Sequence, residues 1–152
     1  MVSGLVIGEV HQGALLVTII ERATSFTVST RVNSKSAKEV TAATITLLKP
    51  FSGAVLTITA DNGKELAFHE QITKALGAPV YFTDPYCSWQ RGLNENTNGL
   101  LRQYWPKITD FKKVSLQAVD AVIAQLNDHP RKKLGYRTPA QLMAEHMAAI
   151  AA

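Results

Sequence analysis

Two carboxylates of this 152-residue chain stand at positions where side chains can do chemistry. Asp61 directly follows residues 55–60, an apolar run that predicts a buried strand. Open α/β sheets carry their functional groups just beyond the carboxyl ends of their strands. Glu95 lies within residues 89–99, a predicted helix segment that contains three Asn, one Thr and two Gly, all poor helix formers. A sequence that accepts such residues in a helix often does so at a functional site.

Together, Asp61 and Glu95 would make a hard oxygen site for Mg²⁺ or Mn²⁺. At helical spacing, Asn98 and Arg102 share the helix face of Glu95, so an amide and a guanidinium would lie beside its carboxylate. Two-metal phosphoryl transfer uses such carboxylates to hold the ions that activate the nucleophile and stabilise the leaving oxygen. Two ions about 4 Å apart normally require a third carboxylate that bridges them.

The residues alone also allow structural roles for both carboxylates. Asp61-Asn-Gly63 is a good turn sequence whatever its chemistry. The Asn residues around Glu95 suit a loop, or a helix end that they cap. The four histidines are scattered without the spacing of metal ligands. Cys87, the single cysteine, excludes an internal disulfide and has no nearby His that suggests a nucleophile.

The composition predicts a single folded domain spanning residues 1–152. With 46% apolar and 18% charged residues, the chain has ample material for one core and is neither disordered nor membrane-spanning. No stretch reaches the roughly 18 unbroken apolar residues of a membrane helix, and the N-terminus lacks a signal sequence. We therefore expect no membrane partner, and the single cysteine makes a reducing cytoplasm the default compartment.

Positive charge is concentrated in one segment. The net charge is +4, but residues 1–84 hold seven basic and seven acidic side chains and are neutral. Residues 85–137 hold nine basic and four acidic side chains, interleaved with six aromatic residues. Such a mixture suits a nucleic-acid surface, with cations on phosphates and rings on bases. A solvated helical face above ordinary core aromatics also explains it, and on this feature alone that is the commoner case.

Apolar runs separated by short turns predict three antiparallel strands early in the chain, at residues 5–7, 14–20 and 26–32. In the third strand Thr27, Ser29 and Arg31 alternate with apolar residues, which predicts one wetter face. Two further strands, at 55–60 and 79–82, each follow a helix, which predicts right-handed parallel crossovers. The pattern indicates a mixed α/β fold whose five-stranded sheet has three antiparallel and then two parallel strands, flanked by helices.

Capping residues set the expected bounds of the helices. Ser36 and Glu39 form a capping-box signature before a helix that Pro50 ends. Gly77 is a typical C-cap for a second helix. That helix carries four apolar side chains at helical spacing, namely Leu66, Phe68, Ile72 and Leu76. Further helices are expected at residues 89–104, at residues 115–126 and from Pro139 onward.

The chain resembles the catalytic core of the insertion-sequence-thirty transposases in three stretches: Asp61-Asn-Gly-Lys-Glu65, Tyr81-Phe-Thr-Asp-Pro-Tyr86 and residues 89–106. That family belongs to the DDE transposase and retroviral-integrase superfamily. The 33 residues between Asp61 and Glu95 agree with the family's spacing, and residues 126–139 resemble its C-terminal signature. The resemblance covers essentially the whole chain and implies a ribonuclease-H-like fold.

This resemblance implies DNA transposition, meaning metal-dependent cleavage of DNA ends followed by strand transfer into target DNA. It implies that Asp61 and Glu95 are catalytic ligands of Mg²⁺ or Mn²⁺. It further implies three DNA contacts, namely Lys64, Asn98 and Arg102. A bacterial, nucleoid-associated homo-oligomer acting on transposon ends and target DNA would follow. We expect an isolated core without the N-terminal helix-turn-helix region that family members usually carry.

The chain departs from the family at the first catalytic aspartate. Gly4 occupies that position in Ser3-Gly-Leu-Val-Ile-Gly8. Glu9 stands five residues on, about 16 Å away in an extended strand and on its opposite face, so it is a poor substitute. We therefore expect an incomplete triad and impaired strand transfer. The alternative is a catalytically silent DNA-binding or oligomerisation module derived from this core. A third hypothesis is a metal-independent protein-interaction domain.

Overall fold

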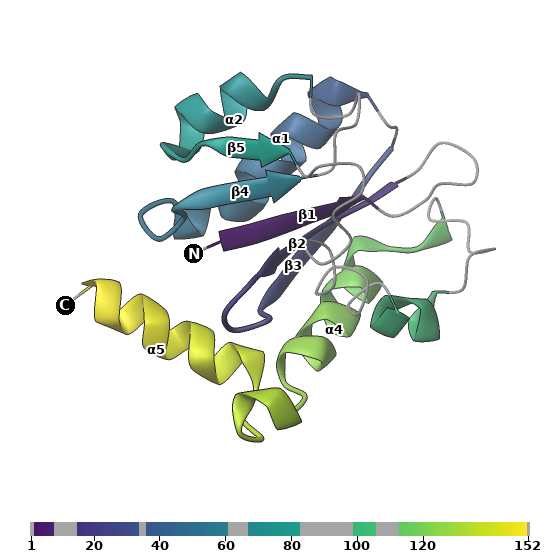
Figure 1. Ribbon diagram of the computed structural model, residues 1–152. Helices are drawn as coiled ribbons and strands as arrows, with labels where there is room; N and C mark the ends of the chain where they lie inside the picture. The colour runs from purple at the N-terminus through teal and green to yellow at the C-terminus, as the bar shows by residue number, and fades with distance from the viewer. Residues whose placement is uncertain are drawn as a thin grey trace.

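The computed structural model describes residues 2–7, 15–33, 36–60, 67–82, 99–105 and 113–151. Its centre is a mixed five-stranded sheet in the order β3-β2-β1-β4-β5 (Figure 1). The strands are β1 (Val2–Ile7), β2 (Leu15–Glu21), β3 (Thr27–Val32), β4 (Thr57–Ala60) and β5 (Val80–Phe82).

Strand β1 joins the two halves of the sheet. It pairs antiparallel with β2 and parallel with β4. The antiparallel half continues from β2 to β3, and the parallel half continues from β4 to β5. The mixed α/β class expected from the sequence is therefore confirmed, with an antiparallel meander followed by parallel additions.

The described α-helices are α1 (Ala37–Leu48), α2 (His69–Leu76), α4 (Leu116–Asn127) and α5 (Pro139–Ala151), and residues 99–104 are also helical. The caps predicted for three of them are confirmed. The Ser36 hydroxyl accepts from the Glu39 N–H at 3.3 Å, and the Ser115 hydroxyl accepts from the Ala118 N–H at 3.1 Å. Gly77 ends α2 in the left-handed conformation, with φ of 70°.

Helix α2 begins later than the sequence predicts. Phe68 occupies the N-cap position with non-helical backbone angles, and its ring is 43% exposed. The buried stripe of the helix consists of Ile72 and Leu76. The spacing of Phe68 fits a helix, but spacing does not determine where a helix starts, and no side chain caps this one. Leu66 and residues 89–98 of the expected long helix lie outside the described residues.

One face of the sheet packs against α1 and α2. Alternate residues of β2 and β4, such as Val17, Ile19 and Ile58, are buried there with Val40 of α1 and Ile72 of α2. We call this group the scaffold cluster; Met143 of α5 also joins it. Because the contributing strand residues alternate in sequence, they all project from the same face.

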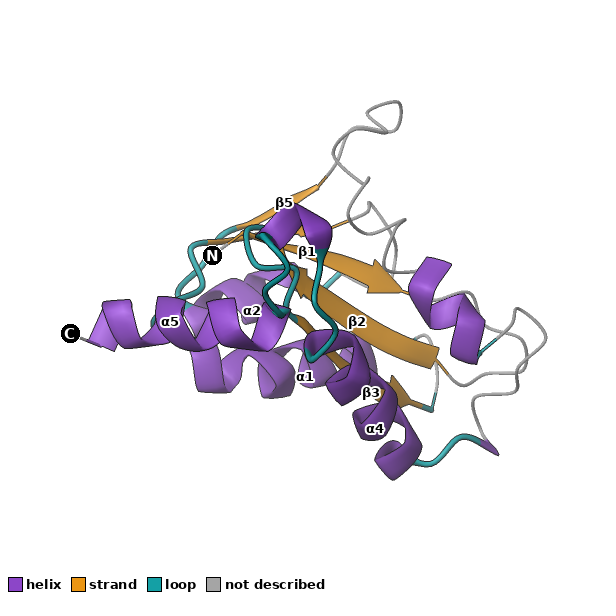
Figure 2. Cartoon of the chain, turned by 90° about the horizontal axis from the view of Figure 1, so that it is seen from below, coloured by secondary structure: helices purple, strands orange, loops and turns teal. Residues whose placement is uncertain are grey.

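The opposite face of the sheet packs against α4 and residues 99–105. Leu16 is buried there with a smaller group that we call the α4 cluster, namely Leu101, Trp105, Val119, Ile123 and Leu126. In the view from below, α4 lies next to β3 (Figure 2). This position corrects the prediction of a wetter face on β3, because Thr27 and Ser29 are buried although they are polar. They are buried because helix α4 covers them. That helix begins 84 residues after the end of β3, so the alternation of residues within the strand does not predict it.

Hydrogen bonds engage the buried residues Thr18, Thr27 and Ser29 on this covered face. The Asn127 side chain accepts from the Thr27 N–H at 2.9 Å and donates to the Thr27 carbonyl at 2.8 Å. The Thr18 and Ser29 hydroxyls lie 3.1 Å apart, and Ser29 also donates to the Val17 carbonyl. Asn127 thus makes the pair of hydrogen bonds with the edge strand β3 that a neighbouring strand would make.

None of the helices in the described part of the chain has the length and apolar character needed to cross a membrane.

Candidate metal and DNA site

Gly4, where the family resemblance predicts the first catalytic aspartate, lies within the central strand of the sheet. Its Cα pairs with that of Ile20 in β2 on one side and with that of Thr59 in β4 on the other. Thr59 pairs in turn with Tyr81 of β5. These four residues form one row across strands that lie about 4.8 Å apart. A side chain at position 4 would therefore have Ile20 and Thr59 as its neighbours on the same face.

This row projects from the face opposite α1 and α2. In β4, Ile58 and Ala60 both belong to the scaffold cluster, so Thr59 between them projects the other way. Thr59 is the penultimate residue of β4, and Asp61 directly follows the strand in the sequence. A carboxylate at position 4 would thus project beside the carboxyl end of β4, on the face that α4 partly covers.

The helical residues 99–104 are anchored on the same face. Leu101 and Trp105 are buried with Leu16 in the α4 cluster. Leu16 immediately precedes Val17, whose Cα pairs with that of Ile7 at the end of β1. Residues 99–105 therefore lie near the carboxyl end of β1, on the face of the Gly4 row.

Of the predicted site residues, the structure describes Gly4 and Arg102. Arg102 is half-buried in the helix anchored by Leu101 and Trp105. The others lie outside the described residues, namely Asp61, Lys64, Glu95, Asn98 and the weighed substitute Glu9. Within the described ranges, no three His, Cys, Asp or Glu side chains gather into a metal-binding group. The metal site of Asp61 and Glu95 thus stays a prediction.

The turn between α4 and α5, residues 131–137, is a compact feature that we call the basic turn. Arg131 and Arg137 form an isolated antiparallel bridge that closes it. The Arg131 guanidinium donates to the Leu126 carbonyl near the end of α4 at 3.2 Å. Burial lowers the pKa of Arg131, while burial and then the neighbouring Arg131 charge lower the pKa of Lys133. The resemblance of residues 126–139 to a family signature does not predict this closed shape. The glycine at position 135 is the residue type that permits it, because Gly135 adopts the left-handed conformation with φ of 66°.

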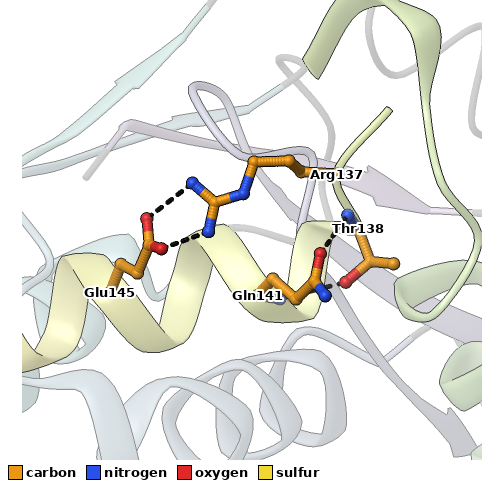
Figure 3. Close-up of polar contacts among 4 residues, drawn as sticks. All are labelled: Arg137, Thr138, Gln141 and Glu145. Atoms are coloured by element: carbon orange, nitrogen blue, oxygen red, sulfur yellow. Dashed lines mark hydrogen bonds and ion pairs between the residues drawn. The ribbon is translucent and has the colours of Figure 1, made fainter. Parts of the chain in front are cut away.

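The start of α5 is fixed by two reciprocal interactions, shown in Figure 3. Thr138 and Gln141 form a capping box, in which each side chain accepts from the other residue's N–H, at 3.1 and 3.0 Å. Arg137 makes a bidentate ion pair with Glu145. Hydrogen bonding within this pair raises the pKa of Arg137 and lowers the pKa of Glu145.

The sequence is similar to transposases over most of its length. It is 47% identical over 134 residues to the transposase for insertion sequence element IS4351 of Bacteroides fragilis, covering 88% of this chain and 41% of that protein. It is 40% identical over 134 residues to the transposase InsI for insertion sequence element IS30A of Escherichia coli, covering 88% of this chain and 35% of that protein. The resemblance to the insertion-sequence-thirty transposases is confirmed. No protein-family model matches the chain.

The similarity to these insertion-sequence-thirty transposases concerns a segment of each. The chain spans about two fifths of the length of the curated relatives that it matches. Among solved structures, the catalytic core domain of BIV integrase superposes with a TM-score of 0.74 at 19% identity, covering 97% of both chains. This likeness confirms a ribonuclease-H-like α/β fold. The transposase-like segment therefore has the architecture of an integrase catalytic core.

Proposed function

We propose that this chain is the DNA transposition and integration core of an insertion-sequence transposase, impaired at its first catalytic position. The observation that carries the proposal is the match between sequence and fold. A segment 47% identical to a named transposase has the fold of an integrase catalytic core. Its Gly4 row lies beside the strand that leads directly into Asp61.

In this proposal the chain's own carboxylates hold the divalent ion. Asp61 and Glu95 supply hard oxygen donors, a donor set that suits Mg²⁺ or Mn²⁺. When bound, such an ion polarises the scissile phosphate and lowers the pKa of the attacking water. Lys64, Asn98 and Arg102 contact the DNA backbone and orient it. Arg102 suits this role because its helix is anchored on the proposed catalytic face by Leu101 and Trp105.

The donor set is one carboxylate short of a two-ion site. Gly4 has no side chain, and the neighbours of position 4 in its row, Ile20 and Thr59, supply no carboxylate. Two remaining carboxylates fit one ion, but they leave a second ion without the bridging ligand that it requires. We infer that the chain binds DNA and a single ion, and that its strand transfer is strongly reduced.

A catalytically silent module for DNA binding or oligomerisation is the second candidate, and Gly4 is the observation that favours it. Such a module would keep salt-dependent DNA binding and self-association without metal-dependent nicking. Both candidates share further proposals, namely a single-domain core over residues 1–152 and a homo-oligomer, because transposition joins two DNA ends. Both also place the protein with DNA in a bacterial nucleoid.

The test is nicking of a supercoiled plasmid in Mn²⁺ by this chain and by Gly4→Asp. Gly53→Asp is the matched control, because a Cβ at Gly53 meets no atom within 4 Å and the same charge is added at a distant loop. We expect Gly4→Asp to nick and the other two proteins to be at least about tenfold slower, which corresponds to a barrier difference of at least about 1.4 kcal/mol. Adding Asp61→Asn to Gly4→Asp should abolish the gain.

Two results would count against the proposal. Equal nicking by this chain and by Gly4→Asp would mean that another carboxylate completes the site. Nicking by Gly4→Asp that survives Asp61→Asn would mean that the activity does not depend on the proposed metal ligands. No nicking by any of the proteins, with salt-dependent DNA binding retained, would favour the silent module.

A further inference from the structure

Only some residues of the basic turn make contacts that stabilise the fold. Its backbone is closed by hydrogen bonds, including Arg131 N–H to the Arg137 carbonyl at 3.1 Å and Tyr136 N–H to the Arg131 carbonyl at 2.9 Å. Arg137 is occupied by its ion pair with Glu145. Within the described part of the chain, Lys132 and Lys133 form no ion pair, and both are exposed. The contacts among the described residues therefore do not account for the two lysines.

Tyr136 is a third residue of the turn whose side chain is not used in these contacts. Its φ is 64°, in the left-handed region that non-glycine residues rarely adopt. Its side chain is 69% exposed, the highest value among the large exposed hydrophobic residues of the described chain. Asn or Gly would adopt this backbone conformation with less strain. A strained residue that gains no burial points to a use outside the fold.

Apart from Arg137, the cations of the basic turn form no ion pair with any residue that the structure describes. Arg131 is partly buried, and no described residue accepts a hydrogen bond from its Nε. Burial and then the neighbouring Arg131 charge lower the pKa of Lys133, as expected where two cations lie close together. An approaching polyanion would relieve this repulsion, since opposite charge favours the protonated form of a lysine.

A groove connects the basic turn with the helical residues 99–104. It has a volume of about 500 Å³ and is lined on one side by Arg131 and His129 and on the other by Gln103 and Tyr104. Asp128 also lines it, so the groove is not uniformly positive. The helix on its far side carries Arg102 and continues the segment that contains Glu95. A ligand in this groove would therefore contact Arg131 of the basic turn together with Gln103 and Tyr104 of the helix.

We propose that the basic turn is a docking site for the backbone of duplex DNA, with Lys132 and Lys133 on phosphates and the Tyr136 hydroxyl donating to a phosphate oxygen. Lysine, arginine and tyrosine side chains all make such backbone contacts in protein–DNA complexes. The inference rests on the proposed function, because it assumes that DNA is the substrate. It adds a DNA contact surface on the α4–α5 connection, separate from the predicted contacts Lys64, Asn98 and Arg102.

The test measures DNA affinity against salt by fluorescence anisotropy, without metal, on the full chain and a duplex of mixed sequence. The double variant Lys132→Gln/Lys133→Gln is compared with Lys38→Gln/Lys74→Gln. The control lysines are also exposed, and they lie on α1 and α2, which pack on the other face of the sheet. Both double variants lose the same net charge, so they differ only in where the charge is lost.

We expect the turn variant to bind DNA about tenfold more weakly and to lower the slope of log K against log salt by about two, one for each phosphate contact. The control variant should change each value by much less. Equal losses in the two variants would overturn the inference while leaving the proposed function intact. Failure of the unaltered chain to bind DNA at low salt would overturn both. Dependence on the turn for an RNA duplex but not for DNA would also overturn the inference.

Tyr136 gives an independent test with two readouts. Tyr136→Asn relieves the backbone strain, so the melting temperature should rise by about 2–4 °C while DNA affinity falls several-fold. Tyr136→Phe keeps the ring and the strain, so it should leave the melting temperature unchanged and still weaken DNA binding. Unchanged DNA affinity in both variants would overturn the role of Tyr136, because a purely structural tyrosine would move the melting temperature alone.

Discussion

The two faces of the central sheet are built in different ways. On the scaffold face, β2 and β4 contribute an apolar set of side chains to α1 and α2. On the other face, the buried strand residues include Thr18, Thr27 and Ser29, which are held by hydrogen bonds, and the row of Gly4 has no side chain at its centre. Apolar packing tolerates no open position without loss of stability, whereas a face that presents polar groups can carry chemistry. The scaffold face thus holds the sheet, and the other face is the one on which function is expected.

The largest effect should come from the scaffold face. Ile58 is 1% exposed within the scaffold cluster. Ile58→Ala should lower the free energy of unfolding by about 2–5 kcal/mol, because it removes buried methyl groups and leaves a cavity. The measurement is urea denaturation followed by circular dichroism. Leu56→Ala is the control, since Leu56 is 65% exposed and its truncation should change the free energy by less than about 0.5 kcal/mol.

A similar loss in the free energy of unfolding for Leu56→Ala and Ile58→Ala would contradict this expected difference. It would show that stability is not concentrated in the scaffold cluster.

The polar face should depend on hydrogen bonds instead. Asn127→Ala removes both bonds to Thr27 and leaves a buried N–H and a buried carbonyl without partners. We expect a loss of about 2–3 kcal/mol in the free energy of unfolding, measured by the same urea titration. The exposed Asn33 offers a control, because Asn33→Ala should have almost no effect. If Asn127→Ala also left the free energy of unfolding unchanged, the hydrogen bonds of Asn127 would not be what holds α4 to β3.

The smallest effect is expected at the exposed pair Arg137–Glu145. The ion pair lowers the pKa of Glu145 below its ordinary value of 4.5, so near that pH the folded chain binds fewer protons than the unfolded chain. The stabilisation is complete above pH 4.5 and is lost as pH falls through the lowered pKa. In Glu145→Gln the melting temperature should therefore fall less steeply below about pH 4.5 than in the unaltered chain. Parallel pH curves for the two proteins would contradict this.

Local signals in the sequence predicted the local structure well. Ser36, Ser115 and Gly77 each act within four residues of the cap that they form, so their sequence context contains the whole interaction. The antiparallel and parallel pairings followed from short turns and helical crossovers. Long-range covering could not be predicted in this way. Thr27 and Asn127 are 100 residues apart, and nothing in either neighbourhood indicates that they pair.

The candidate site was likewise predictable from the sequence only in part. The resemblance of the sequence to a transposase family predicts a carboxylate at position 4, where this chain has Gly4, and the register shows that this position shares a row with Thr59 of β4. Asp61, Glu95, Lys64 and Asn98 lie outside the described residues, so their roles stay predictions. The basic turn was part of a recognised signature, but its exposed Tyr136 became apparent only from the backbone conformation.

The central claim is that the polar face lacks one metal ligand, at position 4. Titration calorimetry with Mn²⁺ on this chain, Gly4→Asp and Gly53→Asp tests it most directly, because it needs neither a DNA end nor catalysis. We predict that Gly4→Asp binds Mn²⁺ at least about tenfold more tightly than the other two, a gain of at least about 1.4 kcal/mol. Equal affinity for all three proteins would contradict the claim, and so would a Gly4→Asp protein that cannot fold, because the claim requires room for a carboxylate in that row.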